Sequence, residues 1–149
     1  MVNYEIRKQW DKVMQDHVIV QHNPEDNSDI IYNSVKPPVF FISKRDFVQK
    51  RKIWKGVLCP DSILIHSTKT EHPSYPEKSN PVRGQIILGG VYLKTLSINP
   101  HKVLYCTVSQ NDLRGNITAA MINDSVPKRS KEMVKNFVAG LNQVYRGKK

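Results

Sequence analysis

Cysteine is scarce in this chain, and long hydrophobic runs are missing. The 149 residues contain two cysteines, Cys59 and Cys106, in no recognisable motif. Their number and spacing exclude a disulfide framework and favour a reducing compartment. No apolar run approaches the roughly 18 residues of a membrane-spanning helix. Glu5, Arg7 and Lys8 precede any apolar block, so the sequence shows no secretory signal pattern and we expect a cytoplasmic protein.

Motifs for metal binding, cofactor binding and catalysis are also missing. The five histidines form no H-x3-H pair, and neither cysteine belongs to a C-x2-C pair. The sequence contains no G-x-S-x-G, P-loop or G-x-G-x-x-G motif, and Gly89-Gly90 is interpreted as a turn. We therefore expect no metal ion, no cofactor and no catalytic residues, which is typical of a protein that is not an enzyme.

Positive charge is what the chain has in excess. Lysine and arginine total 23 against 13 acidic residues, which gives a formal net charge of +10. Such a domain binds nucleic acid, an anionic membrane or an acidic protein, although a solvated helix face gives the same pattern. Nucleic acid is the least favoured of these partners and we expect none, because the aromatic residues are scattered rather than interleaved with basic ones.

Hydrophobic periodicity predicts a sheet between two helices. Apolar residues at three- and four-residue steps predict a long helix from Asn116 to Tyr145, in which Pro127 causes a kink or starts a second helix. A shorter helix is predicted from Tyr4 to about Gln15. Strand patterns lie between them, at residues 17–22, 29–35, 47–54, 63–68, 82–88, 91–98 and 103–109, with a bend at 36–39 and a surface loop at 72–81. This order predicts one α+β domain with the long helix laid across a curved antiparallel sheet.

Some charged residues share a face with apolar ones. Arg51 alternates onto the same strand face as Phe47 and Ile53. Arg7 and Asp11 form an i,i+4 pair between apolar stripes, which is either partly buried or an ordinary surface pair. The last strands are apolar on both faces, as expected if the sheet packs on one side and lines a space on the other. A sheet sandwiched between other structure would give the same pattern.

Short motifs follow one another in a fixed order along the chain. They are Arg7-Lys-Gln-Trp-Asp11, Ile31-Tyr32, Arg45-Asp-Phe-Val48 with Arg51, Ser67 with His72-Pro73 and Pro76, Val82-Arg83, and Asp112 with Gly115 and Asn123. The set resembles the START domain of the steroidogenic-acute-regulatory-related lipid transfer proteins over nearly the whole chain. The order and spacing carry this resemblance, since no single motif in the set is specific.

The resemblance implies the helix-grip fold, in which a curved antiparallel sheet and a long C-terminal helix enclose one lipid in a tunnel. It implies that residues 1–149 form a single lipid-binding domain that transfers a glycerophospholipid between membranes. START domains normally begin further upstream, so we expect a shortened member or a piece of a longer domain. Two alternatives remain open: a sterol as the ligand, and a cyclase-type enzyme of the same superfamily.

The resemblance also implies a headgroup site. The first motif is nearest to that of phosphatidylcholine-transferring members, which implies Arg7 as the phosphate ligand and Asp11 as its orienting partner. Arginine suits this role because its planar fork donates two parallel hydrogen bonds. In sterol-binding members an arginine at the position of Arg51 lies in the cavity, which leaves a sterol hydroxyl at Arg51 as an alternative ligand.

The aromatic cage that holds choline in those relatives is not kept. Its positions fall at Asn33, Phe47 and Ile87, which leaves one aromatic of three. The resemblance therefore implies a phosphate-bearing lipid but puts choline selectivity in doubt. Val35 and Tyr105 complete the implied lipid-binding set.

The long C-terminal helix is expected to meet the membrane. A lipid leaves a closed tunnel only if part of its wall moves, and this helix is the most exposed wall. We expect its basic face to dock on an anionic membrane surface, which makes the protein peripheral to membranes. The expected contact residues are Lys128, Arg129, Lys131 and Lys135.

Overall fold

The computed structural model describes residues 4–36, 42–99 and 101–146. Its elements follow the predicted order of a helix, a series of strands and a second helix. They are α1 (Tyr4–Trp10), β1 (Met14–Asn23), β2 (Ser28–Val35), β3 (Arg45–Lys55), β4 (Ser62–Lys69), β5 (Val82–Arg83), β6 (Gln85–Ile98), β7 (His101–Asp112) and α2 (Ala119–Arg146). The expected bend at 36–39 lies largely outside the described residues.

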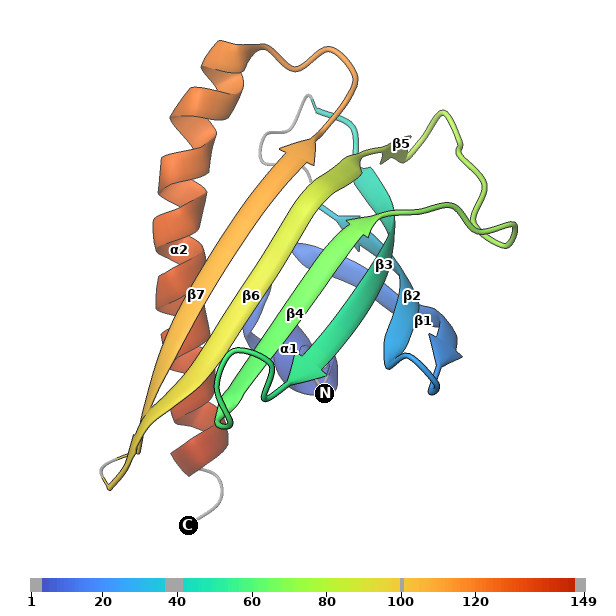
Figure 1. The fold of residues 1–149 in the computed structure, drawn as a ribbon. Coiled ribbons are helices and arrows are strands. Elements are labelled where there is room, and N and C mark those ends of the chain that lie inside the picture. The colour runs from blue at the N-terminus through green and yellow to red at the C-terminus, as the bar shows by residue number, and fades with distance from the viewer. Residues whose placement is uncertain (1–3, 37–41, 100, 147–149) are drawn as a thin grey trace.

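The strands form a single curved sheet with both helices on one side. Its order is β1-β2-β3-β4-β6-β7 with antiparallel neighbours, and the short β5 pairs in parallel with β3. Figure 1 shows α1 and α2 behind the sheet, and neither of these two helices covers the face toward the viewer. The predicted α+β helix-grip architecture is therefore confirmed.

The strand register determines which residues point toward the helices. Tyr105 of β7 contacts Phe137 of α2, with ring centroids 5.0 Å apart, so the odd-numbered residues of β7 face that helix. Directly opposite residues in an antiparallel pair lie on the same face. Following the register from β7 through β6 and β4 puts the odd-numbered residues of β3 and β2 on this face as well. We call this side of the sheet the inner face, and the other side the outer face.

The outer face is covered in part by the loop that precedes β5. Tyr75 of this loop stacks on Tyr32, with centroids 4.2 Å apart. Arg83 donates two hydrogen bonds to the Asp46 carboxylate, at 2.8 and 3.0 Å, and a third to the carbonyl of Tyr75. Both charged side chains are buried, and a bidentate pair of this kind compensates the cost of desolvating them. The loop is thereby attached to the centre of the sheet.

Two predicted boundaries are wrong for local reasons. α1 ends at Trp10 rather than near Gln15, because the Asp11 carboxylate accepts the N–H groups of Val13 and Met14 and turns the chain into β1. β6 runs through Gly89 and Gly90 without the expected turn. A Cβ at Gly90 would lie 2.9 Å from Val108, so the glycine permits close approach of β7 rather than a reversal. Pro127, in turn, lies inside one continuous helix and starts no second one.

α2 packs on α1 through a glycine contact. Trp10 lies against the α2 backbone at Gly140, which is buried, and a Cβ added there would lie 2.5 Å from two atoms of the indole. The Trp10 ring also contacts Phe137 edge-on at 5.3 Å. Phe137 in turn touches Tyr105 of β7. These three aromatic residues set the position of α2 above the inner face.

Gly140→Ala is expected to destabilise the protein, contrary to the usual effect of this change in a helix. Alanine normally stabilises a helix interior by roughly 0.5–1 kcal/mol relative to glycine. Here the methyl group overlaps the Trp10 ring, and we expect a loss of about 1–3 kcal/mol in the free energy of unfolding. Chemical denaturation in the wild-type and Trp10→Ala backgrounds measures this. If Gly140→Ala destabilises both backgrounds equally, the indole does not cause the effect.

Candidate functional site

Polar side chains of α1 and of the inner face of β1–β3 lie near one another. The first group is on α1, where Arg7 Nε donates to Asp11 Oδ2 at 2.9 Å. The side chains are 35% and 15% exposed, so the pair is partly buried rather than an ordinary surface pair. Asp11 is held by its turn contacts to β1, and it therefore positions the guanidinium of Arg7 at the edge of the inner face.

His17 connects this pair to the sheet. Its ring stacks on Tyr4 of α1 at 5.0 Å, and its Nδ1 lies 2.6 Å from Oδ1 of the buried Asn33 on β2. Burial lowers the pKa of His17, the hydrogen bond with Asn33 opposes this, and the positive charges of Arg7 and Arg51 lower the pKa further. His17 is thus close enough to both arginines to sense their charges.

A second, buried ion pair lies deeper on the same face. Arg51 of β3 is opposite Asp29 of β2 and donates to its Oδ2 from Nε at 3.1 Å and from Nη2 at 2.5 Å. His22 Nδ1 lies 2.7 Å from the other carboxylate oxygen. Burial raises the pKa of Asp29, but the hydrogen bonds from Arg51 and His22 outweigh it and hold the pKa below its usual value. The carboxylate therefore stays ionised and keeps Arg51 engaged.

Apolar side chains surround these polar groups. Ile31, 1% exposed, lies on β2 between Asn33 and Asp29, and the buried Phe47 lies on β3 opposite Asn33. Further along, β7 and α2 present apolar side chains that are exposed. They are Val103, Tyr105, Met133, Val134, Val138 and Leu141. The inner face therefore changes from polar and packed under α1 to apolar and open under α2.

The structure brings most of the expected lipid-binding residues together. Asn33 and Phe47 are directly opposite each other, and Arg51 and Val35 lie on the same face of the same two strands. Asn33 is already bonded to His17, and Arg51 is bonded to Asp29. Two expected residues lie apart from this group. Tyr105 is on β7 under α2, and Ile87 occupies a bulge in β6 with half of its surface exposed.

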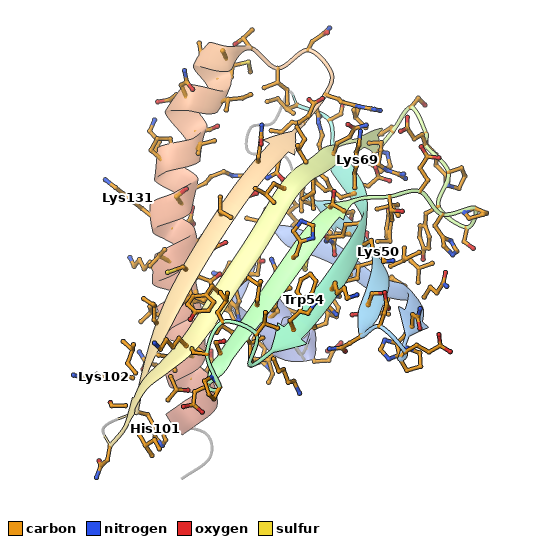
Figure 2. The ribbon with its side chains drawn as sticks, viewed as in Figure 1. Lys50, Trp54, Lys69, His101, Lys102 and Lys131 are labelled. Carbon is orange, nitrogen blue, oxygen red and sulfur yellow. The ribbon has the colours of Figure 1, made fainter. Side chains whose placement is uncertain are left out.

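Three of the four expected membrane-contact residues are exposed on α2. They are Lys128, Lys131 and Lys135. Lys131 points away from the sheet in Figure 2. Lys128 pairs with Asp124 at 2.7 Å, which is an exposed i,i+4 contact of small energetic weight. Arg129 differs from these lysines, because it is half-buried and its Nη2 lies 3.5 Å from the carbonyl of Lys36.

Sequence reasoning missed three residues of this site: His17, His22 and Asp29. The patterns place them on strands but give no indication of their partners, since each bonds across a strand pair. The two-residue alternation along β2 could have indicated Asp29, because it places Asp29 on the same face as Ile31 and Asn33. A charged side chain that shares a face with apolar residues requires a compensating partner, and the same holds for Arg51 on the next strand.

The polar groups of the site were also compared with the requirements of a metal centre and of a membrane-spanning helix. Among the described residues, no group of three or more histidine, cysteine, aspartate or glutamate side chains is arranged to hold a metal ion. No helix in the described ranges is long and apolar enough to cross a membrane. What the inner face offers is a partly exposed arginine oriented by a carboxylate, next to a long apolar surface.

Comparison with known proteins gives one family and several similar folds. The family model described as START domain matches residues 1–146. Human StAR-related lipid transfer protein 5 superposes with a TM-score of 0.81 at 25% identity, over 93% of this chain and 65% of that protein. Human STARD10 follows with a TM-score of 0.74 at 24% identity, over 89% of this chain and 53% of the other. The present chain thus spans less than two thirds of either structure.

A third similar structure is the lipid transfer and protein localization domain of human StarD13 (DLC2). It gives a TM-score of 0.61 at 18% identity, over 74% of this chain and 53% of that domain. At such identities, STARD10 and StarD13 support the fold alone.

His17→Gln is expected to reduce the pH dependence of stability on the acid side of neutrality. A histidine whose pKa is lowered by folding stabilises the native state fully above its unfolded pKa, near 6.5, and less as pH falls below it. Glutamine keeps a hydrogen-bonding group toward Asn33 but cannot take up the proton. Denaturant unfolding at several pH values between 5 and 8 should show a flatter slope, by up to about 1.4 kcal/mol per pH unit.

The matched control is His101→Gln, which removes a histidine from the exposed start of β7. An unchanged slope in His17→Gln would contradict the electrostatic account of this residue.

Proposed function

We propose, on the premise that this chain belongs to the START domain family, that its inner face binds one lipid and carries it between membranes. The ligand class we infer is a glycerophospholipid, and we infer no chemical turnover. The observation that carries this is the partly exposed Arg7–Asp11 pair beside the open apolar surface of β7 and α2. Such an arrangement fits a molecule with an anionic head and long apolar tails.

The apolar surface supplies the driving force for binding the tails. Val103 on the inner face of β7 is 59% exposed, and Val134 on α2 is 54% exposed. Each buried methylene group contributes about 0.8 kcal/mol, so acyl chains that cover this surface stabilise both the ligand and the position of α2. Large exposed apolar patches mark interaction or ligand-binding sites in globular proteins.

The state of the two arginines favours a phosphate over a sterol. Arg51 is buried, with 8% of its side chain exposed, and it donates two hydrogen bonds to Asp29. Replacing that carboxylate with a sterol hydroxyl would leave a buried charge without its partner. Arg7 keeps 35% of its side-chain surface exposed while Asp11 orients it. A phosphate at Arg7 therefore requires less rearrangement than a hydroxyl at Arg51.

The enzymatic alternative has little support among the described groups. A cyclase-type reaction needs two groups that face the substrate: a protonated one that donates a proton and a deprotonated one that accepts a proton. Arg7 and Asp11 are the pair nearest to such a role, but an arginine stays protonated and cannot act as the acid. The pair is better suited to holding an anion than to transferring a proton.

Arg7→Ala is expected to abolish phospholipid extraction while leaving the fold intact. A charge-assisted contact in a dry site contributes about 1.5–3 kcal/mol, which corresponds to an order of magnitude or more in affinity. Arg7→Lys should also be impaired, because a point charge cannot form the bidentate contact. Extraction of fluorescent phospholipid from vesicles, with circular dichroism as the folding control, measures both. Asp11→Asn should weaken extraction less, and wild-type extraction by both Arg7 variants would refute the assignment.

We propose further that α2 is the element that meets the membrane. It presents exposed apolar residues beside exposed lysines, so one helix can exchange its contacts with the ligand for contacts with acyl chains and headgroups. Each basic residue near an anionic surface contributes about 1 kcal/mol, and the effect falls off within a Debye length of roughly 8 Å. Docking should therefore need anionic lipid and weaken as salt rises.

Reversal of Lys128, Lys131 and Lys135 to glutamate is expected to reduce transfer between anionic vesicles sharply. Lipid already bound in solution should be retained, because these side chains are exposed rather than directed at the inner face. The control reverses Lys44, Lys50 and Lys55, which gives the same change in net charge on exposed residues in and before β3. Equal loss of transfer in both triple variants would mean that total charge matters and that α2 has no special role.

A further inference from the structure

The imidazole of His17 is held in place by contacts from two neighbouring elements. Its ring stacks on Tyr4 of α1, with centroids 5.0 Å apart and an angle of 18° between the planes. On β2 it is directly opposite Asn33, and its Nδ1 lies 2.6 Å from the Asn33 Oδ1. Tyr4 is itself attached to β1, because its hydroxyl donates to the carbonyl of Gln15 at 3.1 Å. The orientation of the ring is therefore set by α1 and β2 together.

The hydrogen bond with Asn33 determines which ring nitrogen of His17 carries the proton. The carbonyl oxygen of an asparagine side chain can only accept, so Nδ1 is the donor. A neutral imidazole has one N–H group, which leaves Nε2 with a lone pair. No hydrogen bond joins Nε2 to another residue in the described part of the chain. Nε2 can therefore contact a ligand as an acceptor while the ring is neutral, and as a donor once the ring is protonated.

His17 lies beside the arginine that is proposed to hold the phosphate. Arg7 follows Tyr4 by three residues in α1, so these two side chains are neighbours on the same side of the helix. Because the imidazole stacks on Tyr4, it lies next to that side of α1. The charge of Arg7 acts on the imidazole from this position. A phosphate bound by Arg7 would therefore lie close to His17.

The charged and titratable groups around His17 come from three elements. They are Tyr4, Arg7 and Lys8 of α1, Asp29 of β2 and Arg51 of β3, with Asp11 and His22 as the partners of Arg7 and Asp29. Burial lowers the pKa of His17 and the two arginines lower it further, whereas the hydrogen bond with Asn33 and the carboxylate of Asp29 raise it. The net direction is downward, so these surroundings favour the neutral ring. The negative charge of a phosphate at Arg7 would favour the protonated ring instead.

We propose that His17 is a second headgroup ligand, which takes up one proton at Nε2 and donates a hydrogen bond to the phosphate held by Arg7. This inference rests on the proposed function, since it uses the same phosphate site. The proton comes from solvent when the lipid binds and returns to solvent when the lipid leaves. The ligand class that fits is an anionic phospholipid. A zwitterionic headgroup carries its own ammonium group, which competes with the imidazolium for the phosphate charge.

The coupled proton makes binding stronger as pH falls. In the free protein the pKa of His17 lies below 6.5, and a bound phosphate raises it. Above both pKa values the ring is neutral in either state, and below both it is protonated in either state, so the affinity is constant in these two ranges. Between them one proton is taken up, and the affinity rises by up to about tenfold for each pH unit of acidification.

Isothermal titration calorimetry with dihexanoyl phosphatidylmethanol tests this on the full chain. This lipid has one permanent negative charge and no hydrogen-bond donor in its headgroup, so it does not itself titrate between about pH 5.5 and 7.5. Titration in two buffers with different heats of ionisation counts the protons that accompany binding. We expect uptake of up to about one proton per lipid, and an affinity at least several-fold higher at the acidic end of this range.

His17→Gln should bind the same lipid with an affinity that does not change with pH, and without proton uptake. The matched control is His66→Gln, which removes a histidine from the outer face of β4, where its ring lies 6.4 Å from that of Trp54. This control should behave as the wild-type chain does. Circular dichroism at each pH verifies that both variants are folded.

The outcomes separate this inference from the proposed function. Binding without proton uptake, or uptake that persists in His17→Gln, would overturn the role of His17 and leave the phospholipid site in place. Equal uptake with dihexanoylglycerol, which lacks a phosphate, would overturn it as well. Absence of binding at every pH would overturn the proposed function and this inference with it. The proton count and the glycerol comparison use the wild-type chain, so they decide the question even if His17→Gln does not fold.

Discussion

The contact between Trp10 and the α2 backbone at Gly140 is the constraint on which this structure depends. Only a glycine allows the helix to approach the indole so closely, and the approach attaches α2 to α1 rather than flat onto the sheet. Phe137 then reaches Tyr105 at one point on β7, while other apolar residues of both elements stay exposed. α2 is thus held in place by Trp10 and Phe137, while apolar side chains along the inner face stay exposed.

The polar groups of the inner face divide into two kinds. Arg51 and Asp29 compensate each other in a buried pair, and removal of either would leave an uncompensated charge. Arg7 and Asp11 lie closer to the edge, where the guanidinium is oriented yet partly exposed. His17 is near both arginines. Its pKa is lowered because burial and the positive charges of Arg7 and Arg51 disfavour a further positive charge. The buried Arg51–Asp29 pair on the sheet is thereby separate from the partly exposed, oriented Arg7 on α1.

The order of the helices and strands, and the positions of charged residues among apolar ones, could be predicted from the sequence, because both follow local periodicity. Arg51 was found beside Phe47 from the two-residue period, and Arg7 beside Asp11 from the helical spacing. The features that were predicted wrongly or missed depend on contacts between segments that are distant in the sequence. Gly89 and Gly90 resemble a turn until the neighbouring strand is present. The cross-strand partners His17 and Asp29 could not be recognised before the register of β1, β2 and β3 was known.

The central claim is that the open inner face holds one phospholipid. Native mass spectrometry of the chain purified from cells, followed by extraction and identification of whatever it carries, tests this without a choice of ligand in advance. The account predicts a bound species at one per chain whose mass and fragments identify a glycerophospholipid. A chain that is consistently empty, or one that carries only a sterol, would contradict it.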